Sequence, residues 1–373
     1  MNVIDLFAGC GGLSQGFEMA GYNIPIACEW DQWAADTYEL NHPNTKMIRG
    51  DIKKVVSWKK VIADTGCKID GIIGGPSCQG FSLNGNRDPK DPRNSLFMEF
   101  ARCVSEVKPA FFLMENVPGI LSMKTASGDL VQNVIGSVFD SAGYSVRIRV
   151  INAVDCGVPQ SRRRVFFFGF RNDVKPDISW EPKIPRKSVV TVDMAISDLP
   201  RILAGEGLEK QSYLVSAQSD YQKWARKGSK GVYNHVAMRH TDRLVNRFKT
   251  ILPGQSVADV SGEHSALKRG NPSIKSGKVY SQNNQRVVGY LPCPTVAASF
   301  QSNFIHPQLN RNFTAREGAR LQSFPDTYIF KGDRTTMSWE TRLSQYKQIG
   351  NAVPCLLAMT VAKAITATMG AGK

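Results

Sequence analysis

No uninterrupted apolar run in this sequence is long enough to span a membrane. The longest candidate, VPCLLAMTVAKAITATM at residues 353–369, is broken by Lys363, whereas a transmembrane helix needs about 18 apolar residues or more. The opening MNVIDLF places Asp5 where a secretory signal would need a basic segment followed by an apolar one. We therefore expect a cytoplasmic protein with no membrane partner.

Cysteine and histidine are few and scattered. The eight cysteines (10, 28, 67, 78, 103, 156, 293 and 355) include no pair at CxxC spacing, which argues against a zinc ribbon or a dithiol redox motif. The five histidines (42, 235, 240, 264 and 306) form no ligand-spaced cluster, so we expect no bound metal. In a reducing compartment most of these thiols should be free and buried, and one of them is a candidate nucleophile.

Acidic residues are in deficit. The chain has 47 Lys and Arg against 32 Asp and Glu, a net charge of +15. Such an excess favours a polyanionic partner such as nucleic acid. The excess is also uneven, because residues 221–286 hold 13 basic and 3 acidic side chains, a net of +10. We expect this basic segment to contact the polyanion.

Short apolar runs alternate with amphipathic stretches through residues 1 to about 170, as in a parallel α/β sheet. The chain has 373 residues, which suits one large domain or two modest ones. The pattern predicts a doubly wound α/β sheet whose ligands bind at the carboxyl ends of its strands. Strands are expected at residues 3–9, 24–30, 46–52, 70–76, 110–117, 144–151 and 164–170, and helices near 12–21, 31–40, 94–107 and 128–142.

The composition and hydrophobic periodicity of the sequence change after about residue 185. Residues 185–290 are polar, with Gly and Ser and weak periodicity, and helical character returns at 314–324 and 353–369. The last of these stretches is apolar enough to pack onto the first domain, which would make that domain discontinuous in sequence.

The first expected strand runs into a glycine-rich turn, DLFAGCGGLSQG. Gly9, Gly11 and Gly12 carry no Cβ to block a ligand, and the following helix offers free N–H groups. The turn is not a Walker A loop and, with Ser14, not a clean GxGxxG. It suits a nucleotide-type ligand without a phosphate cradle, with Glu29 placed to bind ribose hydroxyls. An ordinary turn between strand and helix is the alternative.

Chemically active groups lie at or near the ends of three other expected strands. Cys78 lies in GGPSCQGFS, where an exposed thiolate would be nucleophilic and a buried structural thiol is the alternative. Glu115, in MENVPG, could act as an acid from a dry pocket or be a plain loop carboxylate. In VPQSRRRV, strand alternation sends Arg162 and Arg164 to one face and Arg163 to the other. Two guanidiniums on one face could bind phosphates or a carbonyl oxygen, unless the strand is a solvated edge.

Together these segments resemble the DNA cytosine carbon-5 methyltransferases of the bacterial and phage, restriction–modification type. The resemblance covers nearly the whole chain except residues 185–290, where that family carries its variable target-recognition region. Ser77 departs from the family pattern, because Pro usually precedes the nucleophile and here stands one residue earlier. The matching segments, in family order and spacing, are DLFAGCGGL, Glu29-Trp30, GPSCQGFS, ENV, QSRRR, RNFTAREGARLQSFPD (311–326) and QIGNAVP (348–354).

The resemblance implies a Rossmann-like methyltransferase fold that binds S-adenosylmethionine. Glu29 would bind the ribose, and Trp30, Asp51 and Ile52 would surround the adenine. The implied cofactor residues are Phe7, Ala8, Gly9, Gly11, Gly12, Leu13, Glu29, Trp30, Asp51, Ile52, Pro76, Leu96, Asn351, Ala352 and Val353.

The resemblance also implies a reaction. Cys78 would add to carbon 6 of cytosine while Glu115 protonates ring nitrogen 3 and Arg164 holds the carbonyl oxygen, with Arg162 as a supporting member of the catalytic set. Addition turns carbon 5 into an enamine carbon that can attack the sulfonium methyl. Since this chemistry is impossible inside a duplex, the target base must be flipped out.

Double-stranded DNA is the implied partner. A loop after the nucleophile would close over the flipped base, while the basic segment holds phosphates and a few side chains read base edges. Solvated surface is the alternative for each of these charges. The implied DNA-contacting residues are Gln79, Ser82, Arg87, Arg93, Lys223, Arg226, Lys227, Lys230, Arg239, Arg243, Lys268 and Arg269.

We thus expect a catalytic domain from residues 1–185 and 345–373 and a target-recognition domain with a hinge from residues 186–344. Such an enzyme would act as a monomer, alongside a cognate restriction or defence system, in the bacterial cytoplasm. Two other functions stay open. One is an RNA (transfer RNA) cytosine-5 methyltransferase, although no CFT tripeptide of that kind is present; the other is a catalytically silent DNA-binding regulator.

Overall fold

The structure is a computed structural model that describes residues 1–77, 94–125, 127–174, 188–268, 271–277, 279–337 and 339–370. The chain divides into two compact units. Unit 1 comprises Met1–Cys156, Arg163–Arg186 and Val353–Lys373, and unit 2 comprises Gly157–Arg162 and Lys187–Ala352.

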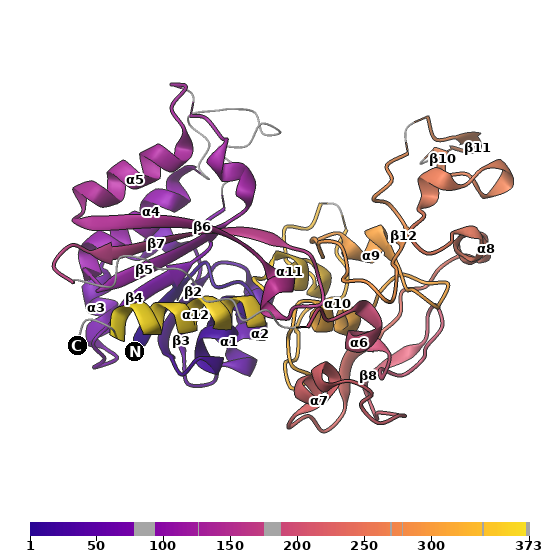
Figure 1. Ribbon diagram of the computed structural model, residues 1–373, viewed down its shortest axis with the longest axis horizontal. Coiled ribbons are helices and arrows are strands. Elements are labelled where there is room, and N and C mark those ends of the chain that lie inside the picture. Colours follow the sequence, from indigo (N-terminus) through magenta and orange to yellow (C-terminus); the bar gives the residue numbers. More distant parts are fainter. Residues whose placement is uncertain are drawn as a thin grey trace. The chain divides into compact units, whose positions relative to one another are not determined.

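Unit 1 is built on a seven-stranded sheet with the order β3-β2-β1-β4-β5-β7-β6 (Figure 1). The first five strands in this order run parallel, whereas β7 is antiparallel to both β5 and β6. The predicted α/β fold is confirmed, but the sheet is mixed and not wholly parallel. The strands are β1 (Asn2–Leu6), β2 (Asn23–Glu29), β3 (Lys46–Arg49), β4 (Gly71–Gly74), β5 (Phe111–Asn116), β6 (Tyr144–Asn152) and β7 (Arg163–Arg171).

The direction of β7 follows from its short connection. Only residues 153–162 join β6 to β7, beginning with a 3-10 turn at Ala153–Cys156. A parallel pair needs a crossover of a dozen or more residues, usually a helix, so this strand returns antiparallel. The start of β7 therefore lies beside the carboxyl end of β5, where Asn116 is opposite Val165.

Helices cover both faces of this sheet (Figure 1). Those of one face share a large hydrophobic cluster with the sheet, and on the other face α1 packs on α12. The first group is α3 (Trp58–Ala63), α4 (Asn94–Val107) and α5 (Val131–Ser141), and the second is α1 (Gly12–Met19), α2 (Gln32–Asn41) and α12 (Cys355–Gly370).

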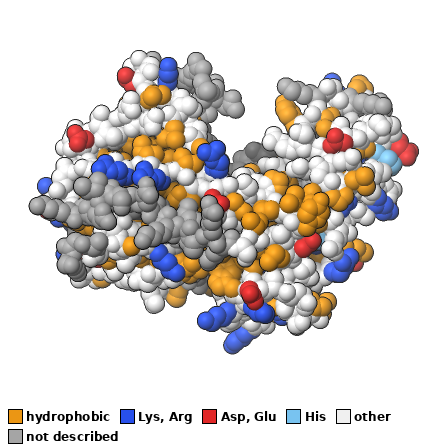
Figure 2. Space-filling view, viewed as in Figure 1, with side chains coloured by type: hydrophobic (Ala, Val, Ile, Leu, Met, Phe, Trp, Pro, Cys, Tyr) orange, Lys and Arg blue, Asp and Glu red, His pale blue; other side chains and the backbone are white. Residues whose placement is uncertain are grey.

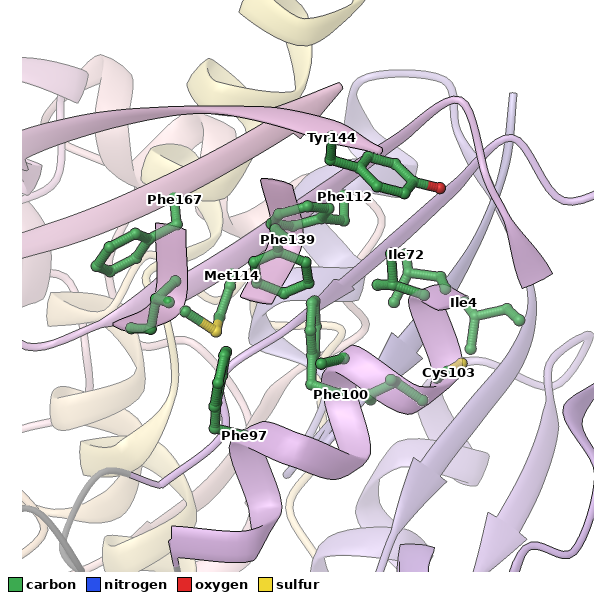
Figure 3. Close-up of a cluster of buried hydrophobic side chains, with 14 of the residues drawn as sticks. Ile4, Ile72, Phe97, Phe100, Cys103, Phe112, Met114, Phe139, Tyr144 and Phe167 are labelled. Atoms are coloured by element: carbon green, nitrogen blue, oxygen red, sulfur yellow. The ribbon is translucent and has the colours of Figure 1, made fainter. Parts of the chain in front are cut away.

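The core of unit 1 is rich in phenylalanine. Figure 3 shows Phe97 and Phe100 of α4 and Phe139 of α5 lying against Phe112 and Met114 of β5. The rings of Phe112 and Phe139 are 4.0 Å apart at their centroids, and all five side chains are at most 6% exposed. Burial of such rings supplies much of the hydrophobic stabilisation, and it fixes β5 beneath the candidate site.

The C-terminal apolar stretch forms two helices. By length and composition alone, Gln345–Gly370 could cross a membrane, but half of its apolar window is buried. Helix α11 (Gln345–Asn351) ends before Ala352, which has an extended backbone, and α12 begins at Cys355. Within unit 1, α12 packs so closely on α1 that a Cβ built on Gly16 would lie 2.3 Å from Ala358 Cβ. The stretch therefore gives only weak support for a membrane span.

Unit 2 consists of short elements. Its described strands pair two by two, β8 with β9, β10 with β11 and β12 with β13. The helices are α6 (Val192–Ile196), α7 (Asp220–Arg226), α8 (Asp242–Thr250), α9 (Phe300–Asn303), α10 (Ala315–Leu321) and α11; the strands are β8 (Gly207–Gln211), β9 (Val232–Val236), β10 (Leu267–Lys268), β11 (Asn271–Lys275), β12 (Gln285–Arg286) and β13 (Phe304–Ile305).

Buried ion pairs organise unit 2, and they come from the RNFTAREGARLQSFPD segment. Arg320 lies 2.6 Å from Asp326 and 3.1 Å from Asp198, with all three side chains fully buried. Arg311 binds Glu317 through two hydrogen bonds of 2.7 and 2.8 Å. Burial alone would raise the pKa of Glu317, but the Arg311 guanidinium outweighs it and holds this pKa well below its usual range. This segment therefore builds the interior of unit 2.

The limits of the two units differ from the expected domain limits at two places. Residues 157–162 and 345–352 belong to unit 2, although both lie in the segments expected to form the catalytic domain. The reason is packing: α11 contacts α9 and α10, and Gln160 Nε2 donates to the Leu321 carbonyl at 2.8 Å.

Candidate active site

An acidic and a basic side chain meet at one edge of the unit 1 sheet. Glu115 is the penultimate residue of β5, and Arg164 is the second residue of β7. Glu115 pairs in register with Phe166, so Arg164 is its diagonal neighbour on the same face. The Arg164 Nε atom lies 2.8 Å from Glu115 Oε1, and these side chains are 12% and 13% exposed. Both residues belong to the catalytic set that the family resemblance implies, and the structure brings them together.

Burial shapes the electrostatics of this pair. It lowers the pKa of the Arg164 guanidinium, and the attraction of the Glu115 carboxylate opposes that shift. Arg164 Nη1 also donates to the Arg163 carbonyl at 2.8 Å. A planar guanidinium and a carboxyl group thus lie side by side and largely shielded from solvent. This arrangement suits recognition of a ring nitrogen next to a carbonyl group.

The segment that leads to Cys78 is attached to β5. Asn116 Nδ2 donates to the Pro76 carbonyl at 3.0 Å, and a Cβ built on Gly75 would lie 3.1 Å from Glu115 Oε2. The structure therefore places the chain just before Cys78 next to Glu115. Cys78 lies outside the described residues, as do Gln79, Ser82, Arg87 and Arg93.

The glycine-rich turn after β1 adopts conformations that favour glycine. Gly9 and Gly11 have φ values of 56° and 90°, and Gly11 is the N-cap of α1. Phe7 has a φ of 58°, which is uncommon for a residue with a side chain. Glu29 fixes the turn, because its Oε2 accepts from the Gly9 N–H and its Oε1 from the Asp31 N–H, both at 2.8 Å.

The other expected cofactor residues of unit 1 fall into two groups. Phe7, Ile52 and Leu96 pack against the same hydrophobic cluster, whereas Trp30 is 61% exposed. Asp51 accepts from the Lys53 N–H at 3.0 Å. Ala8, Leu13 and Pro76 are buried, and Gly12 is the first residue of α1.

The last three expected cofactor residues lie at the boundary between the units in sequence. Asn351 and Ala352 belong to unit 2, and Val353 is the first residue of the last segment of unit 1.

A buried polar group that was not predicted from the sequence lies beneath this turn. Ser14 Oγ donates to Asp5 Oδ2 at 2.6 Å and lies 2.7 Å from the Tyr38 hydroxyl. Burial and the nearby Glu29 carboxylate raise the pKa of Asp5 to about 7, while Ser14 opposes the shift. The sequence contained one clue, since Asp5 and Ser14 flank the glycine-rich turn.

Arg162 does not share the position of Arg164. The expected strand alternation fails because β7 begins at Arg163, and Arg162 belongs to unit 2. Its side chain is 2% exposed and donates to the carbonyls of Val296, Gly350 and Ala352. These contacts of Arg162 are with the backbone of unit 2, and its place as a supporting member of the catalytic set stays a prediction.

The basic residues expected to contact DNA are not equivalent in unit 2. The Arg226 guanidinium lies 3.7 Å from the centre of the Tyr213 ring and hydrogen-bonds Asp198, so it is a packing residue. Figure 2 shows Lys and Arg side chains gathered over α7. Of the basic residues expected to contact DNA, those that are exposed in unit 2 are Lys223 (paired with Asp220), Lys227, Lys230, Arg239, Arg243 (bonded to the Ser265 carbonyl) and Lys268, whereas Arg269 lies outside the described residues.

Metal ligands and disulfides do not occur in the part of the chain that the structure describes. No group of three His, Cys, Asp or Glu side chains there is placed to hold a metal ion. The seven described cysteines are free thiols, and Cys67 is the one among them that is not buried.

Two known proteins are similar to this chain along nearly its whole length. Type II methyltransferase M.DdeI of Desulfomicrobium norvegicum is 59% identical over 369 residues, 98% of this chain and 88% of the relative. Type II methyltransferase M.NgoPII of Neisseria gonorrhoeae is 34% identical over 373 residues, 99% of this chain and 96% of the relative.

Solved structures agree on the fold. A prophage-encoded E. coli protein, described as a DNA modification methyltransferase, has a TM-score of 0.77 at 28% identity, covering 99% of both chains. S. pombe Dnmt2 methyltransferase has a TM-score of 0.56 at 19% identity, covering 100% of this chain and 99% of the other, and shows a common fold alone. The family model for C-5 cytosine-specific DNA methylases matches residues 1–367. This chain therefore belongs to the C-5 cytosine-specific DNA methylase family and is a DNA cytosine-5-methyltransferase.

Proposed function

We propose that the enzyme methylates carbon 5 of cytosine in one specific double-stranded DNA sequence, with Cys78 as nucleophile and Glu115 and Arg164 as its partners. The 2.8 Å contact between Glu115 and Arg164 is the observation that carries this proposal. It supports a site where a carboxyl group and a guanidinium bind adjacent polar atoms of one ring.

Each residue has a chemical task in this proposal. The Cys78 thiolate forms a bond to carbon 6 while the Glu115 carboxyl gives a proton to ring nitrogen 3. Arg164 donates to the carbonyl oxygen of the ring and stabilises the charge that develops there. The electron pair then resides at carbon 5, which takes up the methyl group as the thioether part of the donor leaves. Removal of the carbon 5 proton by a base expels the thiolate, and ring nitrogen 3 returns its proton to Glu115, which restores the neutral aromatic ring and the acid.

The described residues at and near the glycine-rich turn fit S-adenosylmethionine as methyl donor. Glu29, with both oxygens fixed by backbone N–H groups, stands where ribose hydroxyls bind in Rossmann-like folds. The exposed Trp30 ring offers a stacking surface for a purine, and Gly9 and Gly11 allow close backbone approach. When bound, this cofactor supplies an electrophilic methyl group.

The target base must leave the duplex to reach this edge of the sheet. We assign Gln79, Ser82, Arg87 and Arg93 to the loop that closes over it. The exposed basic residues of unit 2 would hold the DNA phosphates, which position a protein without reading sequence. M.DdeI and M.NgoPII are type II methyltransferases, so we propose that this enzyme protects DNA from a cognate restriction enzyme. We also propose that it acts as a monomer in the bacterial cytoplasm.

The test is methyl transfer by the variant Cys78→Ser. We expect the rate of labelled methyl transfer to unmethylated duplex DNA to fall below detection, because a hydroxyl does not form the thiolate that adds to carbon 6. The matched control is Cys67→Ser, a partly exposed thiol of the same chain, which should retain the wild-type rate. An undiminished rate for Cys78→Ser would refute the nucleophile assignment, and bisulfite sequencing of a plasmid that carries the gene would identify the target sequence.

A further inference from the structure

Three sequence motifs that lie far apart in the chain meet in one buried polar cluster of unit 2. It consists of the side chains of Gln160, Arg162 and Gln322 and the backbone of residues 349–352, and we name it the junction cluster. The three side chains are at most 2% exposed. All of them bond backbone groups, so the cluster is built to hold the chain in place.

Arg162 donates hydrogen bonds to the backbone carbonyls on both sides of Asn351. Its Nη2 atom donates to the Gly350 carbonyl at 2.9 Å and to the Ala352 carbonyl at 3.2 Å. Its Nη1 atom donates to the Val296 carbonyl at 2.7 Å. The carbonyls before and after Asn351 are thus bound by a single guanidinium, and hydrogen bonds from a charged donor are among the strong ones.

Gln322 and Gln160 complete the cluster. Gln322 Nε2 donates to the carbonyls of Ile349 and Ala352 at 2.6 and 3.2 Å, and Gln322 Oε1 accepts from Gln160 Nε2 at 2.7 Å. A Cβ built on Gly350 would lie 2.3 Å from the Ala297 carbonyl oxygen, so this turn also packs tightly against backbone. The side chain of Asn351, in contrast, is exposed.

The junction cluster stands where two connections leave unit 2. Arg162 is the last residue before the chain enters unit 1 at Arg163, and Ala352 is the last before it enters unit 1 at Val353. The first connection leads to Arg164 two residues later, and the second follows directly on Asn351. One guanidinium therefore fixes the starting points of both connections.

We propose that Arg162 is a positioning residue for methyl transfer: it holds the unit 2 ends of these connections in register, so that Arg164 and Asn351 keep their positions during the reaction. This inference rests on the proposed function, in which Arg164 binds the target base and Asn351 the cofactor. It also gives Arg162 a role that contact with substrate does not explain.

Unit 2 offers a matched control for a buried guanidinium. Arg286 is 5% exposed and donates to the carbonyls of Ile251 and Phe248, both at 2.6 Å. It resembles Arg162 in burial and in its bonds to backbone carbonyls, but it lies far in sequence from either connection. Removal of its fork should therefore destabilise unit 2 without moving Arg164 or Asn351.

The experiment compares Arg162→Lys with Arg286→Lys in the full-length enzyme. Lysine keeps the charge but lacks the planar fork that reaches several carbonyls. We expect Arg162→Lys to lower kcat at least about ten-fold, since small misplacements at a reacting centre cost rate, with affinity for unmethylated plasmid DNA unchanged within about three-fold. Arg286→Lys should lower Tm while keeping kcat close to the wild-type value. Each variant's kcat is measured at the same number of degrees below its own Tm. Equal reductions of kcat in the two variants under these conditions would overturn the proposal.

A second readout does not depend on activity. Amide hydrogen exchange in residues 348–354 should speed up in Arg162→Lys and stay unchanged in Arg286→Lys, and unchanged exchange in both variants would also overturn the proposal. A double-mutant cycle with Asn351→Ala adds a test of mechanism, because effects on S-adenosylmethionine affinity should be non-additive if Arg162 acts through Asn351. Full activity of Cys78→Ser would defeat the proposed function and leave the exchange result standing.

Discussion

Arg164 Nε lies 2.8 Å from Glu115 Oε1 because β7 runs antiparallel to its neighbour β5. In a wholly parallel sheet the first residues of β7 would lie at the opposite edge from the last residues of β5. The short return after β6 reverses the strand and brings its start to the edge where β5 ends. The geometry of the candidate site thus depends on the direction of one strand.

Glu115→Gln should remove most of the activity while leaving the fold in place. Glutamine cannot deliver the proton, and a positioned acid contributes about a hundred- to ten-thousand-fold to a rate. It also leaves the Arg164 guanidinium, 12% exposed, without its anionic partner. We expect methyl transfer to unmethylated plasmid DNA to fall by at least about a hundred-fold, measured as initial rates at saturating substrates.

The control for this change is Glu39→Gln. Glu39 also pairs with an arginine, since Arg49 Nη2 lies 2.6 Å from Glu39 Oε2, but the two side chains are 40% and 42% exposed. Surface pairs contribute little, so this variant should keep the wild-type rate. Retention of more than about a tenth of the activity by Glu115→Gln would argue against an acid role.

The sequence predicted the sheet of unit 1 well, and there is a physical reason. Strand β4 (GIIG) and the first four residues of β5 (FFLM) are continuous apolar runs, and amphipathic helices such as α4 show a 3.6-residue period. Strand direction is not written in such local patterns. The antiparallel β7 follows from the length of a connection and from the excursion of residues 157–162 into unit 2.

Unit 2 shows where sequence reasoning stops. Its strands β10, β12 and β13 have two residues each, too few to show a period. Arg162 and Arg226 look like free cations in the sequence, yet the structure uses both for packing. Arginine types alone cannot separate these roles, because the difference lies in which carbonyls, rings and carboxylates surround each guanidinium.

Gly16→Ala should destabilise unit 1. A Cβ at this position would lie 2.3 Å from Ala358 Cβ and 2.5 Å from the Cys355 carbonyl oxygen, so α1 and α12 would have to separate. Overpacking of this kind typically costs about 1–3 kcal/mol. We expect a lower denaturation midpoint, followed by circular dichroism.

Gly136→Ala is the matched control, since Gly136 is inside α5 and a Cβ there meets nothing within 4 Å. It should stabilise the protein by about 0.5–1 kcal/mol, as alanine does in a helix interior. A Gly16→Ala variant that is as stable as Gly136→Ala would show that α1 and α12 do not pack as described.

Asp5→Asn should change the pH dependence of stability. Burial, reinforced by the Glu29 carboxylate, raises the pKa of Asp5 from 3.8 to about 7, so the folded state binds a proton that the unfolded state has released. Stability therefore decreases as pH rises from about 4 to about 7, by on the order of 4 kcal/mol. We expect this decrease to shrink in Asp5→Asn, measured by urea denaturation at pH 5 and pH 8.

An exposed acid provides the comparison. Asp64 is 66% exposed and pairs with Lys46 at the surface, so Asp64→Asn should show the same pH dependence as the wild type. If Asp5→Asn also follows the wild-type curve, Asp5 is not the group whose ionisation opposes folding.

Lys227→Ala combined with Lys230→Ala should weaken the salt dependence of DNA binding. Both side chains are exposed, and removing one lysine–phosphate interaction should reduce the slope of log K against log salt by about 0.9. Lys59→Ala with Lys60→Ala, an exposed pair on α3 of unit 1, removes the same charge and should leave the slope close to that of the wild type. Arg226→Ala should instead lower Tm, because Arg226 packs on Tyr213 and pairs with Asp198. Equal slope changes for the two lysine pairs would mean that the net charge of the protein, and not the position of Lys227 and Lys230, controls DNA binding.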